Sequence, residues 1–151
     1  MRRLIIDANL LVLLIVGRMD RSLVTRHRRT KQFSVEDYDL LSEYLTPFDQ
    51  VVVTSGILTE CSNLLRQADE FTAKRLMEGL ALLISDVDEQ RVPAADVRGA
   101  EHFCRLGLTD STILEAMGNH LPLLTADLDL YLTANRVYGG ASINFHYLRR
   151  L

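Results

Sequence analysis

Short apolar runs alternate with longer segments of helical character along this chain, and this alternation limits its fold more than any other feature. The runs at residues 4–6, 51–53 and 121–124 are aliphatic and short, which favours buried strands over helices. Strands that alternate with helices pair in parallel through right-handed crossovers. We therefore predict an α/β fold, with one three-layer α/β/α domain built on a mainly parallel central sheet and occupying residues 1–151.

Length and composition agree with one folded domain. The chain has 151 residues, 48% of them hydrophobic and 25% charged, which is close to the average for globular proteins. Cys61 and Cys104 are too few for a disulfide framework, so we expect two reduced thiols in the core. Asp7 and Asn9 interrupt the apolar run near the amino terminus, which argues against a signal peptide or a membrane span. We therefore expect a cytoplasmic protein with no membrane partner.

Capping residues predict where several helices begin and end. Ser34 followed by Asp37 has the spacing of a capping box and predicts a helix to about residue 45. Asn9 as an N-cap and Gly17 beyond the last turn predict an earlier helix. The remaining expectations are a polar crossing at residues 87–93, helices at 94–105 and from Thr109 to Gly118, and an alternating last strand at 143–147.

One segment, residues 18–33, is strongly basic although the chain as a whole carries a formal charge of −3. We expect it to connect the first two helices. A charge run of this kind is commonly a solvated surface. The competing interpretation is that four of its side chains bind RNA phosphates. Those four are Arg26, Arg28, Arg29 and Lys31.

Acidic residues follow the strand-like runs, and they are the candidates for chemistry. Asp7 and Asp127 come after two of these runs and should reach the same edge of the sheet, while Asp110 and Glu60 can reach it from helix starts. Taken singly, Asp110 fits a helix dipole and Glu60 fits a solvated helix face. Together, four carboxylates would repel one another unless a cation neutralised them. Oxygen ligands alone favour Mg²⁺ or Mn²⁺, which activate water and polarise phosphoryl groups.

The order of the acidic motifs carries a family resemblance. Asp7 follows the first strand, and Asn9 comes two residues later. The next three motifs are TSGILTE, which ends at Glu60, GLTDS, which contains Asp110, and LTAD, which ends at Asp127. This succession resembles the PIN-domain ribonucleases, including the VapC-type toxins of toxin–antitoxin pairs. The resemblance extends over residues 4–129. Each motif is weak alone, and four in register are moderately specific.

The resemblance implies a metal-dependent endoribonuclease that leaves a 5′-phosphate and a 3′-hydroxyl. Asp7, Asp110 and Asp127 would hold one or two Mg²⁺ or Mn²⁺ ions, and Glu60 would complete a second site or orient the attacking water. It also implies an RNA substrate, an antitoxin protein as partner and a homodimer. Residues expected to support the ligands by hydrogen bonds or as outer ligands are Asn9, Thr125 and Asp129.

Other α/β classes fit less well. A receiver domain needs a lysine after its last strand, but the chain has only Lys31 and Lys74. A haloacid-type hydrolase needs an acid two residues after the first Asp, and Asn9 occupies that place. Walker and G-x-S-x-G motifs are absent from the sequence. The alternative that remains open is a catalytically inactive PIN-fold module that binds RNA or protein.

Overall fold

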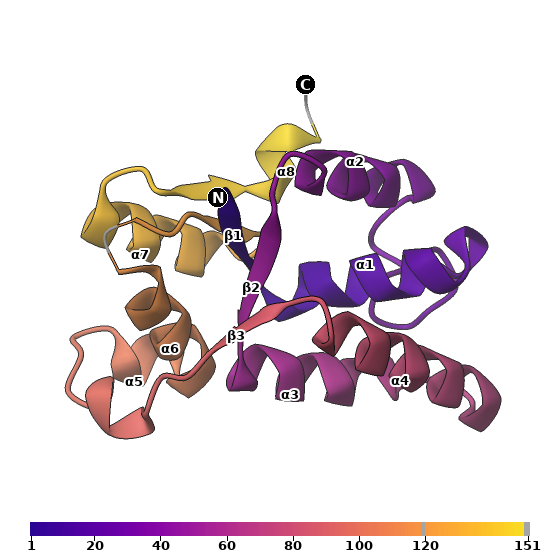
Figure 1. Ribbon diagram of the computed structural model, residues 1–151, viewed down its shortest axis with the longest axis horizontal. Coiled ribbons are helices and arrows are strands. Elements are labelled where there is room, and N and C mark those ends of the chain that lie inside the picture. Colours follow the sequence, from indigo (N-terminus) through magenta and orange to yellow (C-terminus); the bar gives the residue numbers. More distant parts are fainter. Residues whose placement is uncertain (119, 150–151) are drawn as a thin grey trace.

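The computed structural model describes residues 1–118 and 120–149, and its centre is a parallel sheet of five strands (Figure 1). The strand order is β3-β2-β1-β4-β5, and every neighbouring pair is parallel. The sheet and the helices around it confirm the α/β class predicted above. The strands are β1 (Arg3–Ile6), β2 (Gln50–Thr54), β3 (Asp88–Gln90), β4 (Leu123–Thr125) and β5 (Ser142–Asn144).

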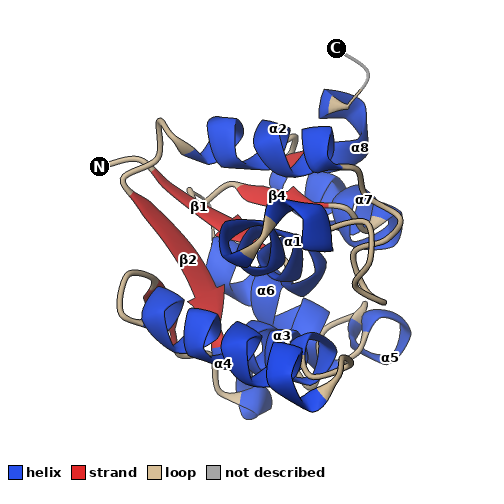
Figure 2. Ribbon diagram, turned by 90° about the vertical axis from the view of Figure 1, so that its right-hand side faces the viewer, coloured by secondary structure: helices blue, strands red, loops and turns tan. Residues whose placement is uncertain are grey.

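The helices form layers beside the sheet. Figure 1 shows α1 to α4 on one side of the strands and α5 to α7 on the other, and Figure 2 shows the first group from the side. Because β1 to β3 advance in one direction and β4 to β5 in the other, right-handed crossovers place the two groups on opposite faces. The α-helices are α1 (Ala8–Met19), α2 (Val35–Leu45), α3 (Ser55–Leu65), α4 (Glu70–Ile84), α5 (Phe103–Leu106), α6 (Leu108–Met117), α7 (Leu128–Tyr138) and α8 (Phe145–Leu148).

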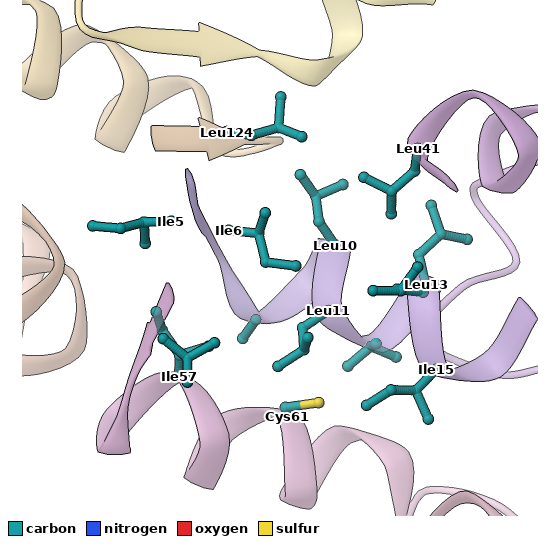
Figure 3. Close-up of a cluster of buried hydrophobic side chains, with 14 of the residues drawn as sticks. Ile5, Ile6, Leu10, Leu11, Leu13, Ile15, Leu41, Ile57, Cys61 and Leu124 are labelled. Atoms are coloured by element: carbon teal, nitrogen blue, oxygen red, sulfur yellow. The ribbon is translucent and has the colours of Figure 1, made fainter. Parts of the chain in front are cut away.

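Helix α1 lies at the centre of its layer, where it contacts α2, α3 and α4. It is apolar on all sides, as expected for a helix without a solvent face, and Figure 3 shows Leu11 among the side chains of the core. The prediction that Gly17 ends the helix is wrong. Gly17 lies inside α1, and a Cβ there would fall 2.1 Å from the ring of Tyr38, so glycine permits this approach of α2. Asn9 is not the N-cap either, since the Asp7 carboxylate takes that place.

The local signals of the next two elements are confirmed. Ser34 and Asp37 form both hydrogen bonds of a capping box at the start of α2. Strand β2 includes the predicted run at 51–53, and Thr54 caps α3. Cys61 lies on the buried side of α3, where burial raises the pKa of its thiol to about 12. This thiol therefore serves as an apolar core group.

The helix predicted from Thr109 to Gly118 is present as α6, but other expectations for the second half of the chain need correction. The crossing at 87–93 contains β3, a polar edge strand paired in register with β2. The segment 94–105 is not one helix but a 3₁₀ turn (Ala94–Asp96) and the short α5, with Gly99 between them. Cys104 on α5 is exposed rather than in the core. The last strand ends at Asn144, whose side chain caps α8.

Within the described residues, no helix is both long enough and apolar enough to cross a membrane.

Candidate active site

Strands β1 and β4 lie side by side at the centre of the sheet, where the direction of the crossovers reverses. Ile6 pairs with Leu124, so the residues that follow both strands emerge together at the carboxyl edge. In open parallel sheets, ligands bind outside the carboxyl ends of the strands at such a reversal. Asp7 and Asp127, which follow these two strands, therefore lie where a ligand would bind in such a fold.

A small cavity of about 30 Å³ opens at this position, and we call it the acidic cavity. Its volume suits one water molecule or one small ion. It is formed by residues from α1, α3, α6 and α7 together with the loops that precede them. The lining residues are Asp7, Ala8, Asn9, Glu60, Thr109, Asp110, Ile113, Asp127 and Leu130. All four predicted acids are thus brought together from segments far apart in the sequence.

Asp7 forms the buried base of the cavity, with an exposed fraction of 6%. One of its carboxylate oxygens accepts a hydrogen bond from Leu10 N at 3.1 Å. The other accepts from the Thr125 hydroxyl and, at 3.1 Å, from Ala126 N. These bonds hold the carboxylate in one orientation and link β1 to the loop after β4.

Thr125 also organises the Asp127 side of the cavity. Its hydroxyl oxygen accepts a hydrogen bond from Asp127 N at 3.0 Å, while the Asp127 carboxylate caps α7 through Leu130 N. His146 supports the same loop, with Nε2 lying 3.1 Å from the carbonyl oxygen of Ala126. Thr125 therefore makes contacts of the kind expected of a residue that supports the ligands, and His146 is a supporting group that the sequence did not single out.

The carboxylates of the acidic cavity disfavour one another's ionisation. Burial and then the charges of Asp127, Glu60, Asp7 and Asp129 raise the pKa of Asp110 from 3.8 to about 7. Partial burial and the charges of Asp7 and Asp127 also raise the pKa of Glu60, which lies at the exposed rim. Burial raises the pKa of Asp7 as well, although its three hydrogen bonds oppose this shift. The cavity thus stores electrostatic repulsion that a bound cation would relieve.

The acids surround the cavity without converging on one point. In residues 1–118 and 120–149, no three side chains of His, Cys, Asp or Glu are spaced to hold a metal ion as they stand. The donor set itself is suitable, because carboxylate oxygens without thiolate or imidazole partners fit Mg²⁺ or Mn²⁺. Metal binding therefore needs adjustment of side chains that the fold has already brought to one cavity.

The other predicted site residues differ in their relation to this cavity. Asn9 lines it from the first turn of α1. Asp129 does not line it, and its carboxylate pairs with the Arg105 guanidinium of α5. Thr109, which was expected to cap a helix, lines the cavity instead, while Gly107 occupies the N-cap of α6. The sequence signal that could have placed Thr109 in the cavity was its position directly before Asp110.

The basic segment lies at the far end of α1. The loop proper begins at Asp20, because Arg18 still belongs to the last turn of the helix. His27 Nε2 lies 3.3 Å from Leu65 O, so the segment packs on the carboxyl end of α3. Since α1 has 12 residues and each rises 1.5 Å, roughly 18 Å separates this end from Asp7.

Several of the basic side chains already have partners. Arg21 pairs with Asp39, and Arg26 with Asp20. Arg29 donates a hydrogen bond to the Gln67 side chain at 2.6 Å. Arg26, Arg28, Arg29 and Lys31 are all exposed. The structure therefore does not bring these four side chains to the acidic cavity.

Another hollow of the molecule is larger than the acidic cavity but contains none of the predicted site acids. A hollow of about 410 Å³ lies between α1 and α4, and its lining includes Ile15, Leu82 and Arg75. The small cavity is the better candidate site because burial and neighbouring charges raise the pKa values of Asp7, Glu60 and Asp110 there, and because it lies at the crossover reversal.

Compared with family profiles, curated proteins and solved structures, the chain gives no match.

Proposed function

We propose that the chain is a PIN-like, divalent-metal-dependent endoribonuclease that hydrolyses RNA phosphodiester bonds. The observation that carries the proposal is the meeting of Asp7, Glu60, Asp110 and Asp127 in one small cavity at the carboxyl edge of the sheet. Acids with purely structural roles gain nothing from sharing a cavity in which burial and neighbouring charges raise the pKa values of Asp7, Glu60 and Asp110. A site that takes up a cation explains why this repulsion is retained.

Each residue has a role in this proposal. Asp7, Asp110 and Asp127 would hold one or two Mg²⁺ or Mn²⁺ ions, which supply activation of water and stabilisation of charge on the phosphate. Glu60 at the rim has a raised pKa, so its carboxylate is a stronger base than usual and suits orienting the water and accepting its proton. Thr125 keeps Asp7 in place through its hydroxyl.

The reaction follows from the same positions. Water attacks phosphorus and gives a proton to the Glu60 carboxylate. The bond from phosphorus to the 3′ oxygen breaks, and that oxygen takes a proton from solvent water and leaves as a hydroxyl. The products carry a 5′-phosphate and a 3′-hydroxyl, as the resemblance to PIN-domain ribonucleases implies.

The finer role is the toxin of a toxin–antitoxin pair in the cytoplasm. Its support is the resemblance to VapC-type toxins, which implies a small antitoxin and a homodimer. A short upstream gene for a DNA-binding protein with a basic tail would support this role. A gene without such a neighbour would favour RNA processing or repair.

Cleavage assays test the central proposal. Purified protein is incubated with mixed RNAs in Mg²⁺, Mn²⁺ or EDTA, beside the variants Asp7→Asn and Asp20→Asn. The proposal expects cleavage with either metal, none in EDTA, loss in Asp7→Asn and retention in Asp20→Asn. Equal products from wild type and Asp7→Asn would indicate a contaminating nuclease.

The alternative is a catalytically inactive PIN-fold module that binds RNA or protein. It is favoured by the spacing of the acids, since no three of them in the described residues are poised around one ion. Metal-independent RNA binding without cleavage products would support this alternative.

A further inference from the structure

A second concavity adjoins the acidic cavity at the same edge of the sheet. It has a volume of about 250 Å³, below the roughly 300–1,000 Å³ typical of pockets for drug-sized ligands. We call it the hydroxyl-lined pocket. Its lining residues come from the end of β2, the start of α3, the segment after β3 and the start of α6. They are Thr54, Ser55, Gly56, Val92, Ala94, Leu108, Thr109 and Thr112.

The lining favours a small, uncharged and partly polar occupant. None of the described residues that line the pocket is charged, and half of them carry hydroxyls. Val92, Ala94 and Leu108 supply apolar surface, and Leu108 remains 48% exposed. An apolar wall with a few fixed polar groups is typical of pockets that hold a small ring system by apolar contact and hydrogen bonds.

Two buried hydroxyls are already oriented by the protein. The Thr54 oxygen accepts a hydrogen bond from Ile57 N at 3.2 Å, so its proton is the part that can be donated to a ligand. The Thr112 hydroxyl donates to Thr109 O at 2.7 Å, so its oxygen can accept. The pocket thus presents a donor and an acceptor, which is the minimum needed to read the edge of a base.

Thr109 and Gly56 connect this pocket to the acidic cavity. Thr109 lines both hollows, so they share a wall. A Cβ at Gly56 would lie 3.2 Å from the Thr109 hydroxyl oxygen, so glycine keeps this wall uncrowded. Adjacent hollows of different character suit two parts of one nucleotide, with the phosphate at the acids and the base beside it.

We propose that the hydroxyl-lined pocket binds one unpaired nucleobase of the RNA, next to the phosphate that is cleaved. The identity of this occupant rests on the proposed nuclease function. The pocket makes the enzyme selective for single-stranded RNA at that nucleotide, because a base must leave its stack to enter.

The first test needs no catalytic activity. Uridine, cytidine, adenosine and guanosine are titrated separately at millimolar concentration while amide chemical shifts of wild-type protein are followed. We expect at least one nucleoside to shift the amides of Gly56, Leu108 and Thr109. Ala94→Phe, which fills the pocket, should abolish these shifts, whereas the neighbouring exposed variant Ala95→Phe should keep them. No shift with any nucleoside, or equal shifts with inorganic phosphate, would overturn the assignment.

The second test uses cleavage and wild-type protein alone. Once a cut site is mapped in a single-stranded RNA, each nucleotide beside it is replaced in turn by an abasic one. Removal of the base that occupies the pocket should lower kcat/KM by about tenfold or more at one position only. A kcat/KM that stays the same after every abasic replacement would refute the base pocket while leaving the nuclease function intact. Nucleoside shifts without cleavage would instead refute the nuclease function and leave a base-binding site.

Discussion

The regions at the two ends of helix α1 carry opposite charges, and these charges have different surroundings. At the amino end, Asp7 and its three acidic neighbours share a cavity in which their charges oppose one another. At the carboxyl end, Arg26 pairs with Asp20 and other basic side chains extend into solvent. Charges that are paired or solvated cost the folded protein little free energy. Charges that are crowded and partly buried cost more, and such clusters are commonly found at functional sites. The chemistry proposed for this protein therefore belongs to the amino end of α1.

Replacing an acid at each end of α1 should give the largest contrast. Asp7→Asn keeps an oxygen to accept the bond from Leu10 N but removes a ligand charge, so we expect kcat to fall by about 10²–10³-fold. Asp20→Asn at the other end should change it little, because Asp20 is exposed and serves the 3₁₀ turn (Arg21–Leu23). Similar losses in both variants, with both folded by circular dichroism, would remove the functional distinction between the two ends.

Metal binding should stabilise the protein through the amino end. At a concentration one hundred times its Kd, Mg²⁺ or Mn²⁺ should raise the free energy of unfolding by about 2.7 kcal/mol, or the Tm by roughly 5–10 °C. The measurement is thermal unfolding with and without EDTA. The same ions should leave the Tm of Asp110→Asn nearly unchanged, and an equal rise in that variant would argue that they bind elsewhere.

The metal-free protein should lose stability as the pH rises from about 4 to about 7. In this window the folded chain keeps a proton on Asp110, whose pKa is about 7, while the unfolded chain has already lost it at the ordinary 3.8. Asp110→Asn removes this loss. After allowance for solvent screening, we expect it to stabilise the metal-free protein at about pH 8 by on the order of 2 kcal/mol.

Thermal unfolding in EDTA at several pH values checks this prediction. The Tm values of wild type and Asp110→Asn should converge near pH 4, where both carry an uncharged side chain. A constant difference across the pH range would show that packing rather than ionisation separates the two proteins.

Neutralising the basic end should have the smallest effect. If Arg28 and Lys31 each contact one RNA phosphate, changing both to Ala lowers the slope of log K against log salt by about 1.4, because each phosphate of a single strand contributes about 0.7. Binding of Asp7→Asn protein to single-stranded RNA at several salt concentrations measures this slope. An unchanged slope would show that the segment is a solvated surface. The carboxyl end of α1 would then have no role in RNA binding.

The elements predicted best were those whose signals lie within a few residues. The capping box at Ser34 and the β-branched run at 51–53 act through local hydrogen bonds and side-chain shape, and both were confirmed. The errors came where distant contacts override local preference. Gly17 has the usual character of a helix terminator, yet it lies inside α1, where the missing side chain leaves space for Tyr38 of α2. Strand β3 is polar and became visible only through its pairing with β2.

The candidate site shows the same division. The acids could be selected from sequence because each follows a strand or lies near a helix start, and parallel strands share one carboxyl edge. Sequence alone could not show that Asp129 pairs with Arg105, or that the basic segment packs on the carboxyl end of α3. These outcomes depend on which helices become neighbours.

The amino-acid order by itself determined the alternation of strands and helices, the capping of α2 and the four acids worth testing, because periodicity and hydrogen bonding over a few residues are encoded locally. Only the tertiary structure decided that these acids share one cavity, that Thr125 orients Asp7, and that a neutral pocket adjoins them through Thr109. The reason is physical. Charge repulsion, desolvation and cavity shape depend on distances between segments remote in sequence, and those distances exist only after the sheet and its helices have packed.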